Sequence, residues 1–280
     1  MYLMEHKEEG KRLRVKTSYS STKRQLLNAK IGEIPNNSKI IDAGAGAGYV
    51  SKIIGDILVE NEISGCTVCL VDQSASRLKE AEKVVEEVST MVNFEFVQTD
   101  LADIDLPDDS ADFVFSRFVF EYQPDQYSVF KELTRILKVK GRMLIGELDY
   151  DCMSHYGLDS EIEKNLLELV GALGKTGYYD PHTGRKLFSY FYDSKFDEVN
   201  VELEAHHLFY GKLSEGDFIN WDYKLKRLIE LSKSGELKLS FDLDEFGLKF
   251  MEFLRSERRF SYTPIILVQG TKSSQTGIGV

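Results

Sequence analysis

Three alternating glycines follow an apolar segment early in the chain, where residues 39–48 read Lys-Ile-Ile-Asp-Ala-Gly-Ala-Gly-Ala-Gly. Ile40 and Ile41 are typical of a buried strand, and from Tyr49 onward apolar residues recur at helical spacing. Glycines between a strand and a helix let a ligand approach the backbone closely, beside the free N–H groups of the helix. The order of these elements predicts a nucleotide-binding turn, for which a plain tight turn is the alternative.

The spacing of the glycines indicates which nucleotide is bound. A dinucleotide fingerprint, G-x-G-x-x-G, would place its third glycine at position 49, but Tyr49 stands there and the glycine comes one residue earlier, at Gly48. The sequence from Asp42 to Gly48, D-x-G-x-G-x-G, instead resembles motif I of the class I S-adenosylmethionine-dependent methyltransferases. An NAD-dependent oxidoreductase is therefore the less favoured alternative.

A carboxylate ends the next strand-like segment. Residues 67–72 form an apolar run that finishes at Asp72, which can accept hydrogen bonds from both ribose hydroxyls of a nucleoside. Alternatively, Asp72 or Ser74 simply caps the helix predicted over 75–88.

The family resemblance extends over residues 38–150 and is closest to small-molecule methyltransferases of the ubiquinone-biosynthesis type. In such relatives a residue like Asp100 accepts a hydrogen bond from the adenine amino group, and the next leucine packs on the adenine ring. The chain at Ser116 and Arg117, after the family's fourth strand, passes beneath the methionine part of the cofactor. Residues 137–147 resemble the family's Leu-x-Pro-Gly-Gly turn into strand five, although Val139 and Lys140 replace its proline and first glycine. The resemblance implies S-adenosyl-L-methionine as the cofactor. It implies cofactor contacts from an N-terminal lead-in helix and from the strand ends: Tyr19, Asp42, Ala43, Gly44, Ala45, Gly46, Asp72, Gln73, Asp100, Leu101, Ser116 and Arg117.

These residues need a framework that brings the ends of several strands together. Strand and helix patterns alternate from 40 to 148, which predicts a parallel sheet wrapped by helices. The resemblance implies an α/β fold: a three-layer, doubly wound, mostly parallel seven-stranded sheet with the last strand antiparallel, plus a helical lid. The expected regions are lead-in helices covering the cofactor (1–30), a cofactor-binding half (31–150), a substrate half (151–270) with a helical insertion (212–258), and a disordered tail (271–280).

Methyl transfer is an in-line displacement, which requires alignment of the acceptor and removal of its proton where it has one. Glu147 and His155 lie at or after the end of strand five, at the crevice where open α/β sheets bind ligands, and are the catalytic candidates. His206 and His207 are neighbours in a strand and should point to opposite faces, so at most one faces the site. His182 lies in a loop where it caps or packs. A mechanism without a base is the alternative.

The composition restricts the partners. The 280-residue chain has a net charge of -11, and beyond the basic segment 1–30 the charge is -16 (27 bases against 43 acids), which disfavours nucleic acid. No run approaches the ~20 apolar residues of a membrane span, and the N-terminus lacks the pattern of a secretion signal. We therefore expect no membrane association and a cytoplasmic location. Cys66 and Cys69 should point to opposite faces of one strand, and no second C-x-x-C pair exists, so no metal site is expected.

These observations predict a methyltransferase that acts on a small molecule, with O-, N- or C-methylation left open, as a monomer or homodimer. Aromatic residues are frequent in the substrate half and suit a planar or apolar acceptor, although most of them can simply fill the core of the lid. The alternative is a methyltransferase-fold protein that binds the cofactor for other chemistry or for regulation.

Overall fold

The computed structural model describes residues 19–88, 90–149 and 154–276. Its central sheet has eight strands in the order β3-β2-β1-β4-β5-β8-β6, and β7 pairs with the other edge of β8. Strands β1 to β5 run parallel, whereas β8 is antiparallel to β5, β6 and β7. The mostly parallel sheet with an antiparallel last strand is confirmed. The strands are β1 (Lys39–Ala43), β2 (Thr67–Asp72), β3 (Asn93–Gln98), β4 (Ala111–Arg117), β5 (Leu137–Leu148), β6 (Ser154–Tyr156), β7 (Asp197–Tyr210) and β8 (Phe260–Thr271).

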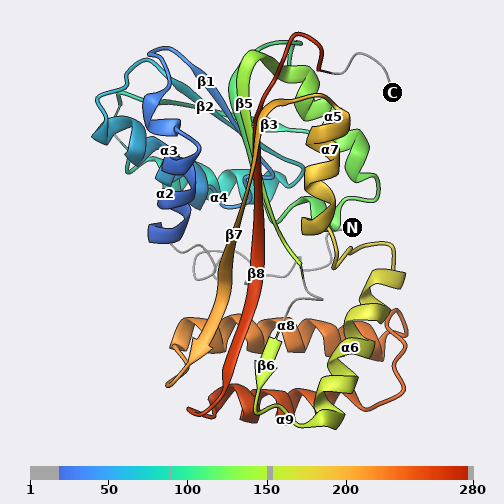
Figure 1. Cartoon of the computed structure of the whole chain (residues 1–280). Coiled ribbons are helices and arrows are strands. Elements are labelled where there is room, and N and C mark those ends of the chain that lie inside the picture. Colours follow the sequence, from blue (N-terminus) through green and yellow to red (C-terminus); the bar gives the residue numbers. More distant parts are fainter. Residues whose placement is uncertain (1–18, 89, 150–153, 277–280) are drawn as a thin grey trace.

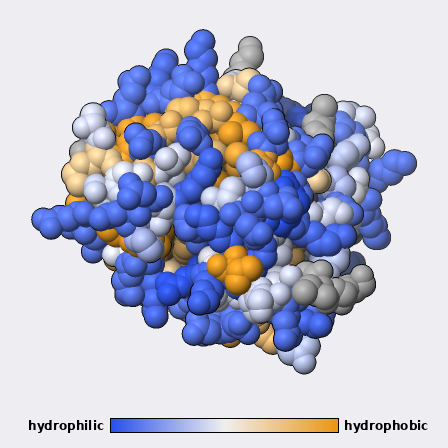
Figure 2. All heavy atoms as spheres, turned by 90° about the horizontal axis from the view of Figure 1, so that it is seen from above, coloured by the Kyte–Doolittle hydropathy of each residue, from blue (hydrophilic) through white to orange (hydrophobic). Residues whose placement is uncertain are grey.

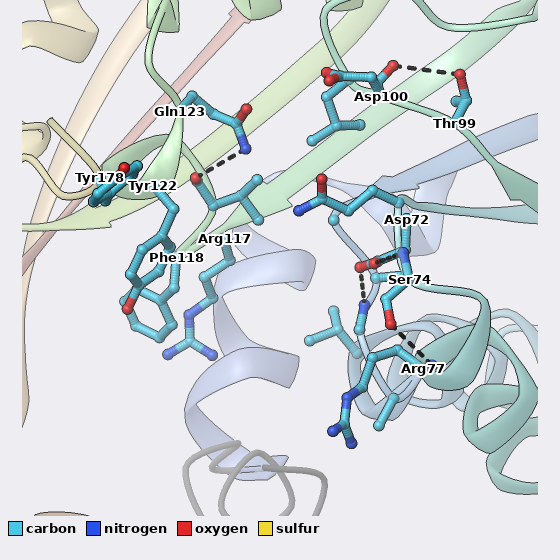
Figure 3. Close-up of a pocket in the computed structure, with 18 of the residues that line it drawn as sticks. Asp72, Ser74, Arg77, Thr99, Asp100, Arg117, Phe118, Tyr122, Gln123 and Tyr178 are labelled. Atoms are coloured by element: carbon cyan, nitrogen blue, oxygen red, sulfur yellow. Dashed lines mark hydrogen bonds between the residues drawn. The ribbon is translucent and has the colours of Figure 1, made fainter. Parts of the chain in front are cut away.

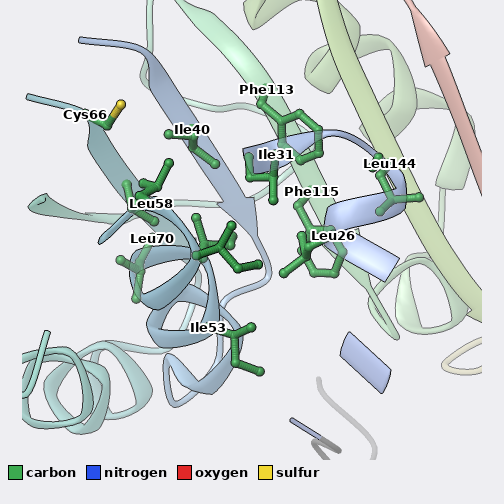
Figure 4. Packing of buried hydrophobic residues seen from close by; sticks show 14 of the residues in the cluster. Leu26, Ile31, Ile40, Ile53, Leu58, Cys66, Leu70, Phe113, Phe115 and Leu144 are labelled. Atoms are coloured by element: carbon green, nitrogen blue, oxygen red, sulfur yellow. The ribbon is translucent and has the colours of Figure 1, made fainter. Parts of the chain in front are cut away.

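Helices cover both faces of this sheet, as Figure 1 shows. Successive residues of a strand point to opposite faces, so Ile40 packs in the core shared with α2, α3 and α4, and Ile41 in the core shared with α5 and α7. Figure 4 shows the first core, where Phe113 and Phe115 of β4 share a cluster with Leu26 of α2. The three-layer prediction is therefore confirmed. The helices around the sheet are α2 (Tyr19–Asn28), α3 (Tyr49–Glu60), α4 (Ala75–Val85), α5 (Gln126–Ile136) and α7 (Leu187–Asp193), with short 3-10 turns η1 (Ile31–Glu33), η2 (Phe120–Tyr122) and η4 (Gly184–Lys186).

The two described cysteines belong to different cores. Cys66 packs in the first core and Cys69 in the second, so they do point to opposite faces, and both are buried free thiols. Within residues 19–88, 90–149 and 154–276, no group of three or more His, Cys, Asp or Glu side chains could hold a metal ion. In the same ranges no helix is both long and apolar enough to cross a membrane.

A second lobe lies below the sheet in Figure 1 and is built from α6 (Ser160–Lys175), α8 (Glu215–Lys233) and α9 (Leu243–Arg255). The long strands β7 and β8 leave the sheet and run into this lobe. Helices α8 and α9 lie between these two strands in the chain. Its core is rich in aromatic rings: Phe250 is fully buried and stacks on Phe246 at 5.5 Å, with Trp221 at 5.3 Å. We call this part the helical lobe, and the sheet with its covering helices the sheet half.

Residues 154–156 form β6, a short strand that pairs with the outer end of β8. The tail differs from what the sequence predicts. The prediction of disorder from residue 271 is wrong for residues 271–276: Lys272 is nearly buried, and its ammonium donates to Asp109 and to the carbonyls of Thr134 and Leu137. Residues 277–280, like the lead-in residues 1–18, lie outside the described ranges.

Hydrophilic side chains cover most of the face seen from above in Figure 2, with hydrophobic residues gathered in smaller areas between them. This distribution is ordinary, because folded proteins do not have enough polar surface to cover every apolar atom. Function must therefore be sought in a cavity.

Candidate active site

A pocket of about 560 Å³ opens at the carboxyl ends of β1, β2, β3 and β4. In open α/β sheets this edge is where ligands bind, because the loops that leave neighbouring strands converge there. Figure 3 shows that Asp72 and Asp100 lie on one side of the pocket, and Phe118, Tyr122 and Tyr178 on the other. The pocket therefore has an acidic side from the strand ends and an aromatic side.

The glycine turn forms the floor between these sides. Gly44 and Gly46 have positive φ angles of 78° and 53°, which side chains rarely tolerate. A Cβ atom at position 44 would lie 2.3 Å from a methyl group of Val119, which also lines the pocket. The backbone N–H groups of Gly44 and Ala45 both donate to the carbonyl of Val71, which fastens the turn to the next strand. The turn is thus a rigid, open cradle.

Asp72 connects this cradle to the start of α4. One carboxylate oxygen accepts the N–H of Gly46 at 2.8 Å, and the other accepts the N–H of Ser74 at 2.9 Å. The helix cap itself is Ser74, whose hydroxyl accepts the N–H of Arg77. Asp72 is half-buried and lines the pocket, so it is placed to meet a ligand and does not serve as the cap.

Eight of the twelve predicted cofactor contacts line the pocket. They are Gly44, Ala45, Gly46, Asp72, Gln73, Asp100, Leu101 and Arg117. Asp100 is exposed and accepts the N–H of Ala102, and Leu101 is buried beside it.

Three other predicted contacts, Asp42, Ala43 and Ser116, do not line the pocket, and their contact with the cofactor stays a prediction. Asp42 accepts the hydroxyl of Ser51 at 2.5 Å, and burial raises the pKa of Asp42 to about 7, against the lowering effect of that hydrogen bond. Ser116 is fully buried and donates to the carbonyl of Ala43. Asp42, Ala43 and Ser116 therefore hold the wall in place. Tyr19 begins α2, but its side chain lies outside the described part of the structure.

Glu147 supports the pocket without lining it, so its predicted role toward the acceptor is corrected. It is fully buried, and one of its oxygens accepts the N–H groups of both Val119 and Phe120 at 2.8 Å. These bonds fix the loop after β4, where Phe118 has a strained positive φ of 59°. Glu147 is a positioning residue for the aromatic side of the pocket.

His155 lies in the helical lobe and does not line the pocket, so its predicted position at the crevice is wrong, whereas its role as a base stays a prediction. Its strand, β6, pairs with residues 260–262 of β8, the part of β8 that has already left the sheet. The ring contacts Phe250 and Phe253, and Nδ1 shares a hydrogen bond with the hydroxyl of Ser261. Burial lowers the pKa of His155 to about 4, which keeps it neutral.

His206 and His207 line one small cavity together, contrary to the expectation that at most one would face a site. A register shift in the β7–β8 pairing between Ala205 and His207 leaves His206 as an extra residue, which defines a β-bulge. The shift lies beside Pro264, which has no N–H to donate to the neighbouring strand. The two rings consequently lie 4.4 Å apart.

Sequence reasoning missed most of the aromatic side. Tyr122 lies in the η2 turn, and its ring packs 5.6 Å from that of Tyr179 in the loop after α6. Residues 176–178 of the same loop close the pocket. The only available signal was the density of tyrosines, which does not show which of them meet.

Comparison with known proteins agrees with this geometry. A family model described as a methyltransferase domain matches residues 41–145. Ubiquinone/menaquinone biosynthesis C-methyltransferase UbiE from Rickettsia massiliae is 28% identical over 115 residues, covering 41% of this chain and 46% of that protein. Phosphoethanolamine N-methyltransferase 2 from Caenorhabditis elegans is 25% identical over 185 residues, covering 63% of this chain and 39% of that protein. The chain thus spans less than half the length of these curated relatives.

The similarity in fold extends further than the similarity in sequence. The crystal structure of a putative methyltransferase from Bacillus halodurans superposes with a TM-score of 0.56 at 18% identity, covering 91% of this chain and 100% of the other. The matched domain begins in β1 and ends in β5, the segment that supplies the glycine turn and the strand-end acids. Residues 41–145 therefore match a methyltransferase domain, and the fold of the chain is similar to that of a methyltransferase.

Proposed function

We propose that the protein transfers a methyl group from S-adenosyl-L-methionine to a small-molecule acceptor. One observation carries this proposal: a pocket of about 560 Å³ gathers the glycine turn, Asp72 and Asp100 from three separate strand ends. When bound, this cofactor supplies a methyl group on a positively charged sulfur. The remaining chemistry is binding and alignment, which the residues of the pocket can provide.

The pocket residues fit the cofactor part by part. Gly44 leaves open the space that a Cβ would fill against Val119. Each oxygen of Asp72 accepts one backbone N–H, and because a carboxylate oxygen can accept more than one hydrogen bond, both ribose hydroxyls can still be bound. Asp100 is exposed beside the buried Leu101, an arrangement that suits a ring with an amino group.

We propose that alignment and exclusion of water provide most of the rate. The described residues that line the pocket include no histidine, and its two acids, Asp72 and Asp100, are the ones assigned to the cofactor. Phe118, Tyr122 and Tyr178 form a wall that would hold an acceptor against the cofactor and keep water away. The charge of -11 supports a small-molecule acceptor over a nucleic acid.

Calorimetric titration with S-adenosylhomocysteine and with NADH tests the cofactor. We expect the homocysteine compound to bind and NADH not to bind; the reverse result would overturn the proposal. Release of S-adenosylhomocysteine in the presence of S-adenosylmethionine and pools of small acceptors then tests the transfer. Binding without any turnover would favour a regulatory role or other chemistry.

Asp72→Ala tests the ribose contact. We expect S-adenosylhomocysteine binding to weaken by about 1.5–3 kcal/mol, the size of a lost hydrogen bond to a charged group. Ser74→Ala is the matched control, because Ser74 caps α4 and should affect stability more than affinity. If Asp72→Ala lowers only the melting temperature and leaves affinity unchanged, the ribose assignment is wrong.

A further inference from the structure

A second, smaller cavity of about 140 Å³ adjoins the proposed cofactor pocket, and Arg117 lines both. This second cavity lies between α2, β7 and α8, and its polar lining includes His206, His207 and Asn220. Because the helical lobe contributes part of its wall, it is the place where the two parts of the molecule meet around one charged side chain.

Arg117 holds two unused hydrogen-bond donors. Its Nη1 donates to the hydroxyl of Thr22 at 2.7 Å, and the guanidinium lies 4.5 Å from the centre of the Phe118 ring. Nε and Nη2 are buried, and no acceptor among the described residues bonds to them. Burial lowers the pKa of Arg117 to about 10, so the group stays charged at neutral pH. A buried cation whose donors lack acceptors is unfavourable unless a ligand supplies them.

The acids near Arg117 already have partners. The carboxylate of Glu204 accepts hydrogen bonds from Arg24 at 2.9 Å and from Gln25 at 2.8 Å. Asp217, at the start of α8, accepts the hydroxyl of Ser214 at 2.5 Å. These acids also make the cavity unsuitable for a highly charged polyanion. A guanidinium with two free donors instead matches a single carboxylate or phosphate group, which it can bind through two parallel hydrogen bonds.

The position of Arg117 beside the proposed cofactor pocket indicates which molecule would carry the anion. Phe118 lines the cofactor pocket, and the His206 ring, which lines the second cavity, lies 4.8 Å from it. Arg117, Phe118 and His206 therefore lie between the two spaces. A molecule anchored in the second cavity could therefore extend past Arg117 and present another of its atoms to the cofactor.

We infer that the second cavity is the anchoring subsite for the methyl acceptor, and that the acceptor carries one carboxylate or phosphate group bound by Arg117. This inference rests on the proposed function. The cofactor's own carboxylate has the same chemistry, so the test must distinguish the two sources.

Calorimetry on the full chain makes this distinction. Affinity for S-adenosylhomocysteine and for 5′-methylthioadenosine, which lacks the amino-acid part, is measured for the wild type, Arg117→Gln and Arg117→Lys. Acetate and inorganic phosphate are then titrated into each protein saturated with S-adenosylhomocysteine. Arg142→Gln, in the middle of β5 and outside the lining of both cavities, is the control for loss of one positive charge. Melting temperatures establish that each variant is folded.

We expect acetate or phosphate to bind the saturated wild type and Arg142→Gln, and to bind Arg117→Gln at least tenfold more weakly. Arg117→Lys should retain intermediate affinity, and it serves as the readout if Arg117→Gln does not fold. Because the inference assigns Arg117 to the acceptor in place of the predicted cofactor contact, S-adenosylhomocysteine affinity should change less than threefold in all variants.

Two results would overturn the inference. One is a tenfold loss of S-adenosylhomocysteine affinity in Arg117→Gln with unchanged 5′-methylthioadenosine affinity, which would assign the anion to the cofactor. The other is absence of acetate and phosphate binding to the saturated wild type. Failure of the wild type to bind S-adenosylhomocysteine at all would instead contradict the proposed function. If this wild type, which does not bind S-adenosylhomocysteine, still bound acetate or phosphate through Arg117, the cavity would be an anion site and not an acceptor subsite.

Discussion

The sheet half and the helical lobe hold their parts of the site in different ways. In the sheet half, hydrogen bonds from backbone N–H groups hold the site. Those of the glycine turn go to Val71 and Asp72, and those of the loop after Phe118 go to Glu147. The helical lobe instead presents side chains and a loop, such as Asn220 and residues 176–178, from a core of packed aromatic rings. The comparison indicates that the proposed cofactor site depends on strand ends, whereas the proposed acceptor site depends on the packing of the lobe.

The largest effect that separates the two regions should come from their cores. Phe250→Ala in the lobe and Phe113→Ala in the sheet half each remove a fully buried ring and should lower the free energy of unfolding by about 3–5 kcal/mol. We expect Phe250→Ala to leave S-adenosylhomocysteine affinity within threefold, and hydrogen exchange to rise only in the lobe. Equal acceleration of exchange in both regions would show that they unfold as one unit.

The two regions should also respond to pH with opposite signs. Burial raises the pKa of Asp42 from its ordinary value of 3.8 to about 7, so the folded state binds an extra proton between these values. Stability should therefore fall as the pH rises from about 4 to 7, by up to about 4 kcal/mol. Asp42→Asn should remove this slope, as measured by urea denaturation across the pH range. An unchanged slope would mean that another group titrates.

His155 gives the opposite sign in the helical lobe. Its pKa falls from 6.5 to about 4 on folding, so the unfolded state binds more protons between those values. Stability should decrease as the pH falls from about 6.5 to 4, by about 3 kcal/mol. His155→Gln should reduce this loss and leave turnover at neutral pH within twofold. A large loss of turnover at unchanged stability would restore His155 as a catalytic candidate.

The smallest expected effect compares two glycines with positive φ. Gly44→Ala places a methyl group against Val119, whereas Gly211→Ala, after β7, meets no atom within 4 Å. Both variants should lose about 1 kcal/mol of stability from backbone strain, and Gly44→Ala should lose more because its Cβ meets Val119. Only Gly44→Ala should also weaken S-adenosylhomocysteine binding, by about a hundredfold, which is about 2.7 kcal/mol. Equal affinities would contradict the role of the cradle.

What the sequence predicts well is local in the chain. The glycine turn, the acid at Asp72 and the alternation of strands and helices are each contained in a short segment, and the structure brings Asp72, Asp100 and Arg117 to one pocket. The location of His155 depends on which part of β8 its strand pairs with, and the role of Glu147 depends on which atoms surround its carboxylate. These are long-range facts that periodicity does not encode.

The bulge at His206 shows the same limit more sharply. Strand periodicity assigns His206 and His207 to opposite faces, but the bulge lies beside Pro264, almost 60 residues later in the chain. Tyr122 was missed for a related reason, since its partner Tyr179 belongs to a loop after α6. Where a site depends on pairs of residues that are distant in the chain, a single sequence provides candidate residues, and only the fold shows which of them meet.

The position of β8 has a consequence for how the protein is made. This strand follows all the other described strands in the chain, yet it lies between β5 and β7. Until it is synthesised, both of those strands present unpaired backbone edges, which are templates for aggregation. The sheet cannot be completed until β8 has been synthesised, because the contacts of β8 with β5 and β7 are non-local and form late. Demand for chaperones should therefore be greatest in the interval before residues 260–271 emerge from the ribosome.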